Sequence, residues 1–241
     1  MSKFFITGDT HGGYGGFSGE MKRFSAYEKM LDKLNKDDYL IIAGDFGFIW
    51  KAFQSDKDEE RWLRYFDSFG FTTLFIDGNH ENFDRLDKME VSEFKGGKVH
   101  KISDSVYHLM RGQIYDFDGV KIFTMGGALS IDKEWRTPGI SWWKQELITQ
   151  KDFDEAMKNL AKVDFSVDFV ITHTCPQSIV PYALNGKPYN PTWHDESCVY
   201  LQKIYEKIKF KKWYFGHWHE ELLEIGDEFI TLWHDIVEIK I

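Results

Sequence analysis

Five short apolar runs, each followed directly by Asp, Asn or His, constrain the fold of this chain more than any other feature of its sequence. The runs and the residues that follow them are Lys3–Thr7 before Gly8-Asp9-Thr10-His11-Gly12, Tyr39–Ala43 before Gly44-Asp45, Thr73–Asp77 before Gly78-Asn79-His80-Glu81, Asp168–Thr172 before His173, and Lys212–Phe215 before Gly216-His217-Trp218-His219. Apolar runs of this length are typical of strands buried on both faces of a sheet. Ligands of open α/β sheets bind beyond the carboxyl ends of the strands, so we expect all five segments to meet at one sheet edge.

The spacing within two of these motifs predicts a metal site. Asp9 and His11 are two residues apart, and so are His217 and His219. Residues two apart in an extended segment point the same way, so both side chains of each pair can reach one ion. Neighbouring glycines remove side-chain bulk and permit sharp turns.

The other three motifs add donors of the same kind. Asp45 supplies a carboxylate that can bridge two cations, Asn79 a carbonyl oxygen and His173 an imidazole nitrogen. These nitrogen and oxygen donors suit Mn²⁺, Fe or Zn²⁺ better than a structural cysteine–zinc site. Two such ions about 3.5–4 Å apart can clamp a phosphoryl group and activate a bridging water. His80 follows Asn79 directly, so we expect it beside the metals and facing the leaving group, as a general acid.

Each motif also has a structural interpretation. A single buried histidine is usually satisfied within the core, and a single Gly-Asp or His-x-His can be turn chemistry. Five such motifs at five strand ends are not explained in this way. For the remaining histidines the structural interpretation is favoured; they are His100, His108, His194 and His234.

Composition narrows the function classes. The 30 basic and 39 acidic residues give a net charge of −9, which argues against binding long nucleic acid by bulk electrostatics. A nucleotide substrate remains compatible, because bound divalent cations would reverse the local charge. Cys175 and Cys198 form no Cys-x-x-Cys pattern, and we find no signal peptide and no apolar run of the ~20 residues that a membrane span needs. We therefore expect a soluble, cytoplasmic protein.

The order of the predicted elements favours two packed sheets with helices outside. Strand-like and helix-like segments alternate in the first half, with helical spacing at 21–34 and 58–69, which argues for a mostly parallel sheet. Short antiparallel strands are predicted at 99–102, 106–109, 113–117 and 120–125, with a hairpin turn at Asp118-Gly119. Helices 143–161 and 197–208 follow, and strands return between 220 and 241. With no repeat and no linker, residues 1–241 are predicted to form a single domain.

Together, the motifs resemble the signature set of the calcineurin-like metallophosphoesterases. Asp9-Thr10-His11, Gly44-Asp45, Gly78-Asn79-His80-Glu81, His173 and Gly216-His217-Trp218-His219 stand in that family's order and span nearly the whole chain. The resemblance implies an α/β fold, a four-layer α/β/β/α sandwich of two mixed sheets flanked by helices. It also implies two divalent metal ions, with manganese the first expectation and iron, zinc or nickel the alternatives.

The resemblance assigns a role to each motif residue. One ion would be held by Asp9, His11, Asp45 and His219, the second by Asp45, Asn79, His173 and His217, and His80 would be the proton donor. Phosphoprotein phosphatases and diadenosine tetraphosphatases resemble the chain at the first and third motifs but continue the second with Asp-Arg-Gly. Here Gly44-Asp45 is followed by Phe46-Gly47-Phe48, so the arginine that would hold phosphate and the aspartate that would support the donor histidine are missing there. This departure argues against those two substrate classes.

A loop between Gly126 and Trp143 is the candidate for substrate recognition. It carries Trp135 and Arg136, which would suit a nucleobase and a phosphate, with a packed surface loop as the alternative. Arg85 and Arg111 are further candidates for phosphate, although a solvated helix position is favoured for Arg85. A glycine-rich loop follows Gly12, and the loop 185–191 is a candidate for the rim of the site.

These observations predict a metal-dependent phosphoesterase that hydrolyses phosphodiester or phosphomonoester bonds with metal-activated water. We expect small phosphate esters or nucleotides as substrates, with a phosphodiesterase favoured over a phosphatase. The alternatives are a nuclease, a protein-type phosphatase and a non-catalytic scaffold of the same fold. The presence of every expected ligand and of His80 argues against the scaffold, and the net charge of −9 argues against the nuclease. The sequence does not indicate the oligomeric state.

Overall fold

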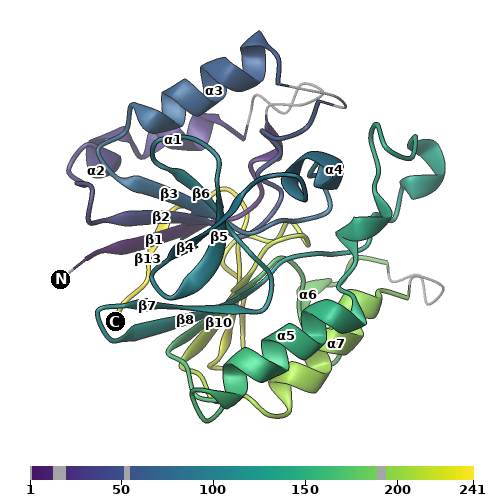
Figure 1. Cartoon of the computed structure of the whole chain (residues 1–241). Helices are drawn as coiled ribbons and strands as arrows, with labels where there is room; N and C mark the ends of the chain where they lie inside the picture. The colour runs from purple at the N-terminus through teal and green to yellow at the C-terminus, as the bar shows by residue number, and fades with distance from the viewer. Residues whose placement is uncertain (1, 13–19, 52–54, 189–193) are drawn as a thin grey trace.

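Two β-sheets lie face to face between two layers of helices (Figure 1). The computed structural model describes residues 2–12, 20–51, 55–188 and 194–241. The glycine-rich loop predicted after Gly12, and the end of the predicted rim loop from residue 189 onward, lie outside the described residues.

The first sheet has the strand order β13-β1-β2-β3-β6-β5-β4. Its strands are β1 (Phe4–Thr7), β2 (Tyr39–Ile42), β3 (Thr72–Phe75), β4 (Val91–Phe94), β5 (Gly97–Lys101), β6 (Val106–Leu109) and β13 (Val237–Glu238). Strands β1, β2, β3 and β6 are parallel to one another, whereas β4, β5 and β13 pair antiparallel with their neighbours. The first three motifs therefore leave the sheet at the same edge, as predicted.

The second sheet has the strand order β11-β12-β10-β9-β8-β7. Its strands are β7 (Gln113–Phe117), β8 (Val120–Met125), β9 (Phe169–Thr172), β10 (Lys212–Phe215), β11 (Glu224–Ile225) and β12 (Phe229–Thr231). The β7–β8 hairpin turns at Asp118 and Gly119, whose φ angles of 57° and 98° are those of the predicted tight turn. Strands β8, β9, β10 and β12 are parallel, so the last two motifs also leave at one edge.

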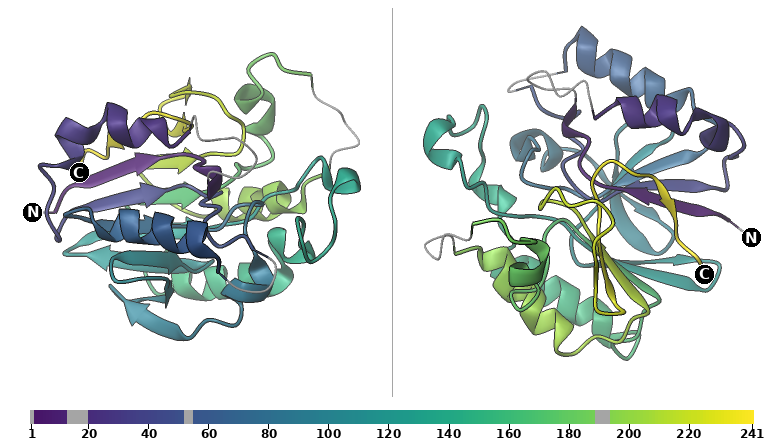
Figure 2. Two further views of the ribbon diagram at one scale, coloured as in Figure 1. Left: turned by 90° about the horizontal axis from the view of Figure 1, so that it is seen from above. Right: turned by 180° about the vertical axis from the view of Figure 1, so that it is seen from behind.

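Helices cover the outer face of each sheet (Figure 2). They are α1 (Lys22–Ala26), α2 (Glu28–Leu31), α3 (Lys57–Asp67), α4 (Phe83–Leu86), α5 (Gln150–Ala161), α6 (Val180–Ala183) and α7 (Glu196–Tyr205), with 3₁₀ turns η2 (Lys133–Trp135) and η3 (Lys144–Glu146). Helices α1–α3 pack on the first sheet and α5–α7 on the second. The predicted four-layer sandwich of two mixed sheets is confirmed.

Alternation along the strands explains why four layers form. In β1, Phe4 and Ile6 point into the layer between the two sheets, whereas Phe5 points outward beneath the helices. All three side chains are at most 5% exposed. Burying such a side chain contributes about 1.5–3 kcal/mol, so a strand that is apolar on both faces is stable only when both faces are covered.

The helix predicted over 143–161 is wrong in its first half. Helix α5 begins only at Gln150, after a capping box formed by Thr149 and Asp152. Arg111, which is distant in sequence, donates hydrogen bonds to the carbonyl oxygens of residues 145, 146 and 147 at 2.8–3.1 Å. Carbonyl groups bound in this way are not free to continue a helix, so the segment stays irregular.

The helix predicted over 21–34 is interrupted. Tyr27 has φ −101° and ψ 9°, outside helical values, and divides the segment into α1 and α2. Its hydroxyl donates to Asp235 Oδ1 at 2.7 Å, which ties this point of the chain to the C-terminal segment. The helical spacing therefore predicted the buried face correctly but not the break.

Candidate metal centre

The five motifs meet where the carboxyl ends of β1, β2 and β3 face those of β9 and β10. Their acidic and histidine side chains form three overlapping groups whose candidate ligand atoms lie within 4.8 Å of one another. These groups are Asp9, His11 and His219; His11, Asp45 and His80; and Asp9, Asp45 and His173. Residues up to 210 positions apart in sequence are thus brought to one point, as predicted.

Asp45 stands between two histidines. Its Oδ2 lies 3.2 Å from His11 Nε2, and its Oδ1 lies 3.3 Å from His173 Nε2. The backbone N–H of His80 also donates to Oδ1, at 2.7 Å. The two carboxylate oxygens therefore face two different parts of the site.

Asp9 occupies the other side of the centre and is fully buried. Its Oδ1 lies 3.6 Å from His219 Nε2 and 4.0 Å from His173 Nε2. The backbone N–H of His217 donates to both carboxylate oxygens, at 3.1 and 3.2 Å. The His217 ring lies beside His173, with ring centroids 5.1 Å apart, and lines the adjoining pocket rather than joining the three groups.

Hydrogen bonds outside the centre fix the orientation of two histidine rings. His11 Nδ1 lies 2.7 Å from Glu20 Oε2, and His173 Nδ1 lies 2.9 Å from the carbonyl oxygen of Ala43. With an acceptor at Nδ1, each ring carries its proton there and turns Nε2 toward the carboxylates. Metal-binding histidines are held in this way by carboxylate or carbonyl partners.

The Asn79 amide is oriented by a similar chain. Its Nδ2 donates to Ser130 Oγ at 3.2 Å, and Ser130 donates in turn to the buried carboxylate of Glu146 at 2.7 Å. The Asn79 carbonyl oxygen consequently faces inward, 3.1 Å from His173 Nε2. Glu20, Ser130 and Glu146 were not predicted, because their positions give no local signal of proximity to the motifs.

The backbone at this site is strained. His11, Asp45, His217 and His219 have φ angles of 48°, 49°, 68° and 51°, in the left-handed region that few non-glycine residues adopt. Each such residue costs on the order of 1 kcal/mol, and such strain gathers at ligand-binding and catalytic sites. Four of the seven predicted metal ligands therefore have a strained backbone conformation.

Two motif glycines are required by close contacts. A Cβ on Gly44, which has φ 91°, would lie 2.1 Å from His173 Nδ1. A Cβ on Gly78 would lie 2.1 Å from Asp45 Oδ1 and 2.7 Å from His173 Nε2. Any side chain at either position would displace the ligands, because real Cβ atoms do not approach other atoms so closely.

The buried negative charges of the centre need positive charges beside them. Asp9 and Asp45 are buried carboxylates, and buried charges need compensation. Burial alone would lower the pKa of His11 and of His173, but their contacts with Asp45 and other carboxylates raise the two values to about 10 and about 9. Without a metal, the two rings are therefore protonated at neutral pH and supply the compensating charge. The donors, their burial and their orientation fit divalent metal ions.

Metal binding is therefore expected to release protons at pH 7, close to one from each of these two rings. The rings must be neutral to bind a metal, so the apparent metal affinity should rise with pH until about 9–10. The folded-state pKa values of His11 and His173 are raised above the ordinary 6.5, so the stabilisation that they give the metal-free protein is complete below about pH 6.5. It is lost progressively as the pH rises to about 9–10. Calorimetric titration with Mn²⁺ in two buffers of different ionisation enthalpy measures the proton count; binding without proton release would contradict this charge assignment.

A family model for calcineurin-like phosphoesterases matches residues 2–221. The chain belongs to this family. No curated protein matches the sequence. Among solved structures, the phosphopantetheinyl hydrolase of Mycobacterium tuberculosis is similar at 16% sequence identity, over 97% of this chain and 90% of that chain, with a TM-score of 0.42.

Membership of the family makes this chain a metal-dependent phosphoester hydrolase. The Asp and His groups at the strand ends are its candidate ligands for the divalent ions that the family implies. None of the helices in the described part of the chain is long and apolar enough to cross a membrane.

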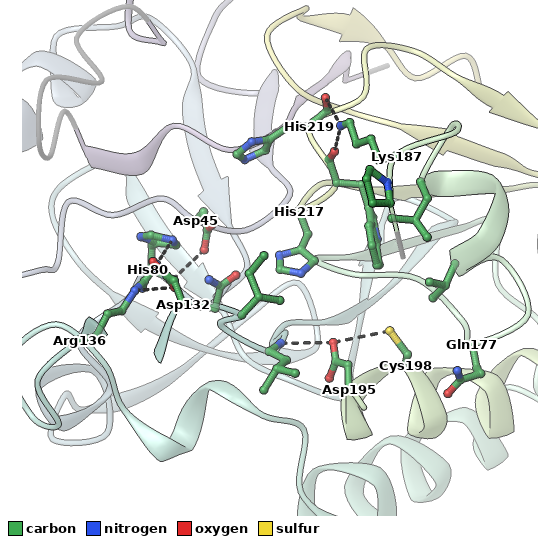
Figure 3. A pocket seen from close by; sticks show the side chains of 17 residues that line it. Asp45, His80, Asp132, Arg136, Gln177, Lys187, Asp195, Cys198, His217 and His219 are labelled. Atoms are coloured by element: carbon green, nitrogen blue, oxygen red, sulfur yellow. Dashed lines mark hydrogen bonds and ion pairs between the residues drawn. The ribbon is translucent and has the colours of Figure 1, made fainter. Parts of the chain in front are cut away.

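A pocket of about 480 Å³ opens beside the metal centre of this phosphoesterase, within the size range of small-molecule sites (Figure 3). Arg136 and His80 lie together at one end, where Arg136 Nη2 donates to His80 Nε2 at 3.0 Å. Arg136 Nε also pairs with Asp132 at 2.8 Å. Arg136 Nη1 is buried and has no hydrogen-bond partner among the described residues.

Trp135 does not line the pocket that its neighbour Arg136 lines. Its side chain is 90% exposed and is not among the residues that line the pocket. The 3₁₀ turn η2 directs it to solvent, while Arg136, in extended conformation just after the turn, reaches inward. Of the two residues predicted to line a substrate pocket, Arg136 lines this pocket and Trp135 does not.

The other two candidate arginines have structural partners. Arg85 Nη1 pairs with Glu59 at 2.8 Å and is only 15% exposed, so the favoured solvated helix position is wrong. Arg111 Nη2 lies 2.6 Å from Asp77 Oδ2, in addition to its bonds with backbone carbonyls. Both guanidinium groups are bound by protein carboxylates and lie outside the pocket beside the metal centre.

Two histidines outside the motifs are satisfied within the core. His100 Nδ1 lies 3.1 Å from His108 Nδ1, and His108 Nε2 lies 3.1 Å from Asp77. Both side chains are buried. This arrangement agrees with the structural role predicted for them.

Proposed function

We propose that this protein is a dinuclear phosphodiesterase for small or nucleotide-type esters. The observation that carries the proposal is the position of Asp45, whose two oxygens face His11 on one side and His173 on the other. A carboxylate placed in this way suits a bridge between two cations, with Asp9, His11 and His219 on one side. Asn79, His173 and His217 would complete the other side. Manganese is the proposed metal, because the donors are oxygen and nitrogen without thiolate.

When bound, the two ions would lower the pKa of a bridging water and offset the charge of the phosphate oxygens. The protein would contribute a positioned anion site in Arg136. Its unpartnered Nη1 and its place beside His80 in the pocket suit a phosphate oxygen. Arg136, in the segment after β8, would thus take the place of the phosphate-binding arginine that phosphoprotein phosphatases have in the motif after Asp45 and that this chain lacks there.

His80 is the proposed proton donor to the leaving oxygen. In the substrate-free protein, burial lowers the pKa of His80 to about 4, and its Nε2 accepts a hydrogen bond from Arg136. The ring is therefore neutral before substrate binds. An arriving phosphate would attract Arg136, free Nε2 and favour protonation of His80 by its negative charge.

A diester is favoured over a monoester by the charges of the pocket. Arg136 is the one cationic side chain among the described lining residues with an unpartnered nitrogen, since Lys187 pairs with Glu220 at 2.6 Å. A phosphodiester carries one negative charge, whereas a monoester carries close to two at neutral pH. A single guanidinium with one unpartnered nitrogen is better matched to the diester.

Hydrolysis of bis(p-nitrophenyl) phosphate and p-nitrophenyl phosphate tests the proposal. The protein would be assayed after chelation and after Mn²⁺ is restored. We expect Mn²⁺-dependent turnover with the diester cleaved faster. Faster cleavage of the monoester would identify a phosphatase, and metal binding without turnover of either ester would favour a scaffold.

Replacing Arg136 by alanine is expected to raise KM for the diester and Ki for inorganic phosphate by about 10–100-fold, the range for one lost charge-assisted hydrogen bond. Arg136→Lys should recover only part of the affinity, because an ammonium group does not reproduce the planar fork. Arg64→Ala is the matched control, because this arginine is 68% exposed on α3. Unchanged KM and Ki in Arg136→Ala would remove the anion site from the proposal.

We also propose that residues 1–241 form one phosphoesterase domain, because the two sheets share a continuous apolar layer. A cytoplasmic location is proposed as well. It is supported by Cys175 and Cys198, which are buried free thiols.

A further inference from the structure

The end of the pocket remote from Arg136 is built from apolar side chains. Gln177 and Cys198 mark this end in Figure 3. We call the following five lining residues the apolar wall: Leu129, Ile131, Val180, Leu184 and Trp218. The first two follow β8, the next two belong to α6 and its C-cap, and the last stands between the two histidines of the final motif.

The apolar wall is partly fixed by the core and partly open to solvent. Val180 and Leu184 are 5% and 7% exposed and pack in the core beneath the second sheet. Ile131 is 57% exposed, although it lines the pocket. The inner part of the wall is therefore preformed, and its rim presents an apolar side chain that nothing in the described part of the chain covers.

Ile131 is the exposed large apolar residue that lines the pocket among the described residues. The large apolar side chains that are at least half exposed in the described part of the chain are Val91, Ile131, Trp135, Ile140, Tyr182 and Ile241. Three of them belong to the segment 131–140, which projects from the body of the molecule (Figure 1), and Tyr182 belongs to α6. Single exposed apolar residues are ordinary, but Ile131 continues the buried apolar side chains of the same pocket, which indicates a surface that binds apolar material.

The two charged side chains at the same end, Lys187 and Asp195, already have partners, whereas the Trp218 indole N–H is buried without one among the described residues. Lys187 pairs with Glu220 and donates to the Trp218 carbonyl oxygen at 2.8 Å. Asp195 accepts hydrogen bonds from the backbone N–H groups of Leu129 and Ser197. A charged organic group placed here would lose hydration, and the charged side chains Lys187 and Asp195 are already paired with other groups.

We infer that the apolar wall receives an uncharged, apolar group of the substrate, alkyl or aryl, esterified to the phosphate. The pocket thus has an anion-binding end at Arg136 and the metal ligands, and a neutral apolar end at α6, which orients the ester. This inference rests on the proposed function. It adds the chemical class of the ester group, which the metal centre by itself does not select.

Inhibition by simple phosphonates isolates the contribution of the wall. Methylphosphonate, phenylphosphonate and 2-aminoethylphosphonate share one anionic head and differ only in the attached group. We expect phenylphosphonate to inhibit Mn²⁺-dependent diester hydrolysis about tenfold more strongly than methylphosphonate, the gain typical of a modest apolar contact. The cationic 2-aminoethyl compound should bind no more tightly than methylphosphonate. Equal inhibition constants for the three would overturn the inference.

Two isoleucines of the same loop provide a matched pair of variants. Ile131→Asp places a charge at the rim of the wall and should remove the advantage of phenylphosphonate over methylphosphonate, measured as the ratio of their two inhibition constants. Ile140→Asp is the control, because Ile140 is similarly exposed, at 53%, but does not line the pocket. Retention of the phenyl preference in Ile131→Asp would count against the wall. Quenching of tryptophan fluorescence by the two phosphonates provides a binding measurement that does not depend on turnover.

The inference and the proposed function fail in different ways. If no ester is hydrolysed but phenylphosphonate still binds more tightly than methylphosphonate, the proposed function is wrong and the apolar site stands. If esters are hydrolysed with no preference among the phosphonates, the proposed function stands and the apolar wall does not select the substrate.

Discussion

Replacing Asp45 by asparagine is expected to reduce Mn²⁺-dependent hydrolysis by at least about 1,000-fold, the scale of losing a principal electrostatic contact of the reaction. The substitution removes one negative charge and replaces one oxygen by an NH₂ group, which is a donor and not a ligand. Because Asp45 faces both His11 and His173, both halves of the centre are affected. Metal content after dialysis should fall together with activity.

The Asp45→Asn measurements need a control variant that loses a carboxylate away from the metal centre. Asp104→Asn serves, because the Asp104 side chain is 97% exposed. It should leave activity and metal content unchanged. Circular dichroism would verify that Asp45→Asn is folded, and a folded Asp45→Asn protein with bound Mn²⁺ and full activity would refute the bridging role.

Replacing His80 by asparagine is expected to slow hydrolysis according to the leaving group. Loss of a general acid typically costs 10²–10⁴-fold, and the cost should approach this range for alkyl esters, whose leaving oxygen needs a proton. It should be small for p-nitrophenyl esters, whose leaving oxygen is stable without one. Metal content should be retained, because the proposed ligands do not include His80. The measurement is kcat/KM for a series of aryl and alkyl diesters.

The surroundings of His80 make this prediction specific. The ring stacks against Trp50 at 5.8 Å and packs edge-on against His11 at 4.9 Å, so its position is fixed by the protein. Arg136→Lys provides the comparison variant, since it alters the contact at Nε2 without removing the imidazole. An equal loss for every leaving group in His80→Asn would show that the residue positions Arg136 or the substrate instead of donating a proton.

The strands and the meeting of the motifs were predictable because both depend on local pattern and chain order. Apolar runs such as 39–43 are too short for buried helices, and parallel pairing places their carboxyl ends together. The histidine and aspartate spacing then indicated a metal site without knowledge of the angles between strands. The helix boundaries were less predictable. The helix predicted to begin at residue 143 begins only at Gln150, because Arg111 binds the carbonyl groups of residues 146 and 147.

The surroundings of the candidate site were not predictable in the same way. Glu20 contacts His11 from nine positions away in the sequence, and Arg136 contacts His80 from 56 positions away. Whether Arg136 or Trp135 turns inward depends on one 3₁₀ turn, which leaves no periodic signal in the sequence. Such contacts depend on how separate elements pack, and only coordinates describe that packing.

The sequence by itself thus determined the family, the two-sheet α/β architecture and the motif residues at the strand ends, because short apolar strands and the order of their polar ends allow few arrangements. Tertiary structure alone decided which groups orient those side chains, which arginine of the pocket keeps an unpartnered nitrogen, and where an apolar wall adjoins the centre. The physical reason is that strand pairing follows local pattern, whereas the pocket is made by side chains from segments that contact one another only after the two sheets have packed.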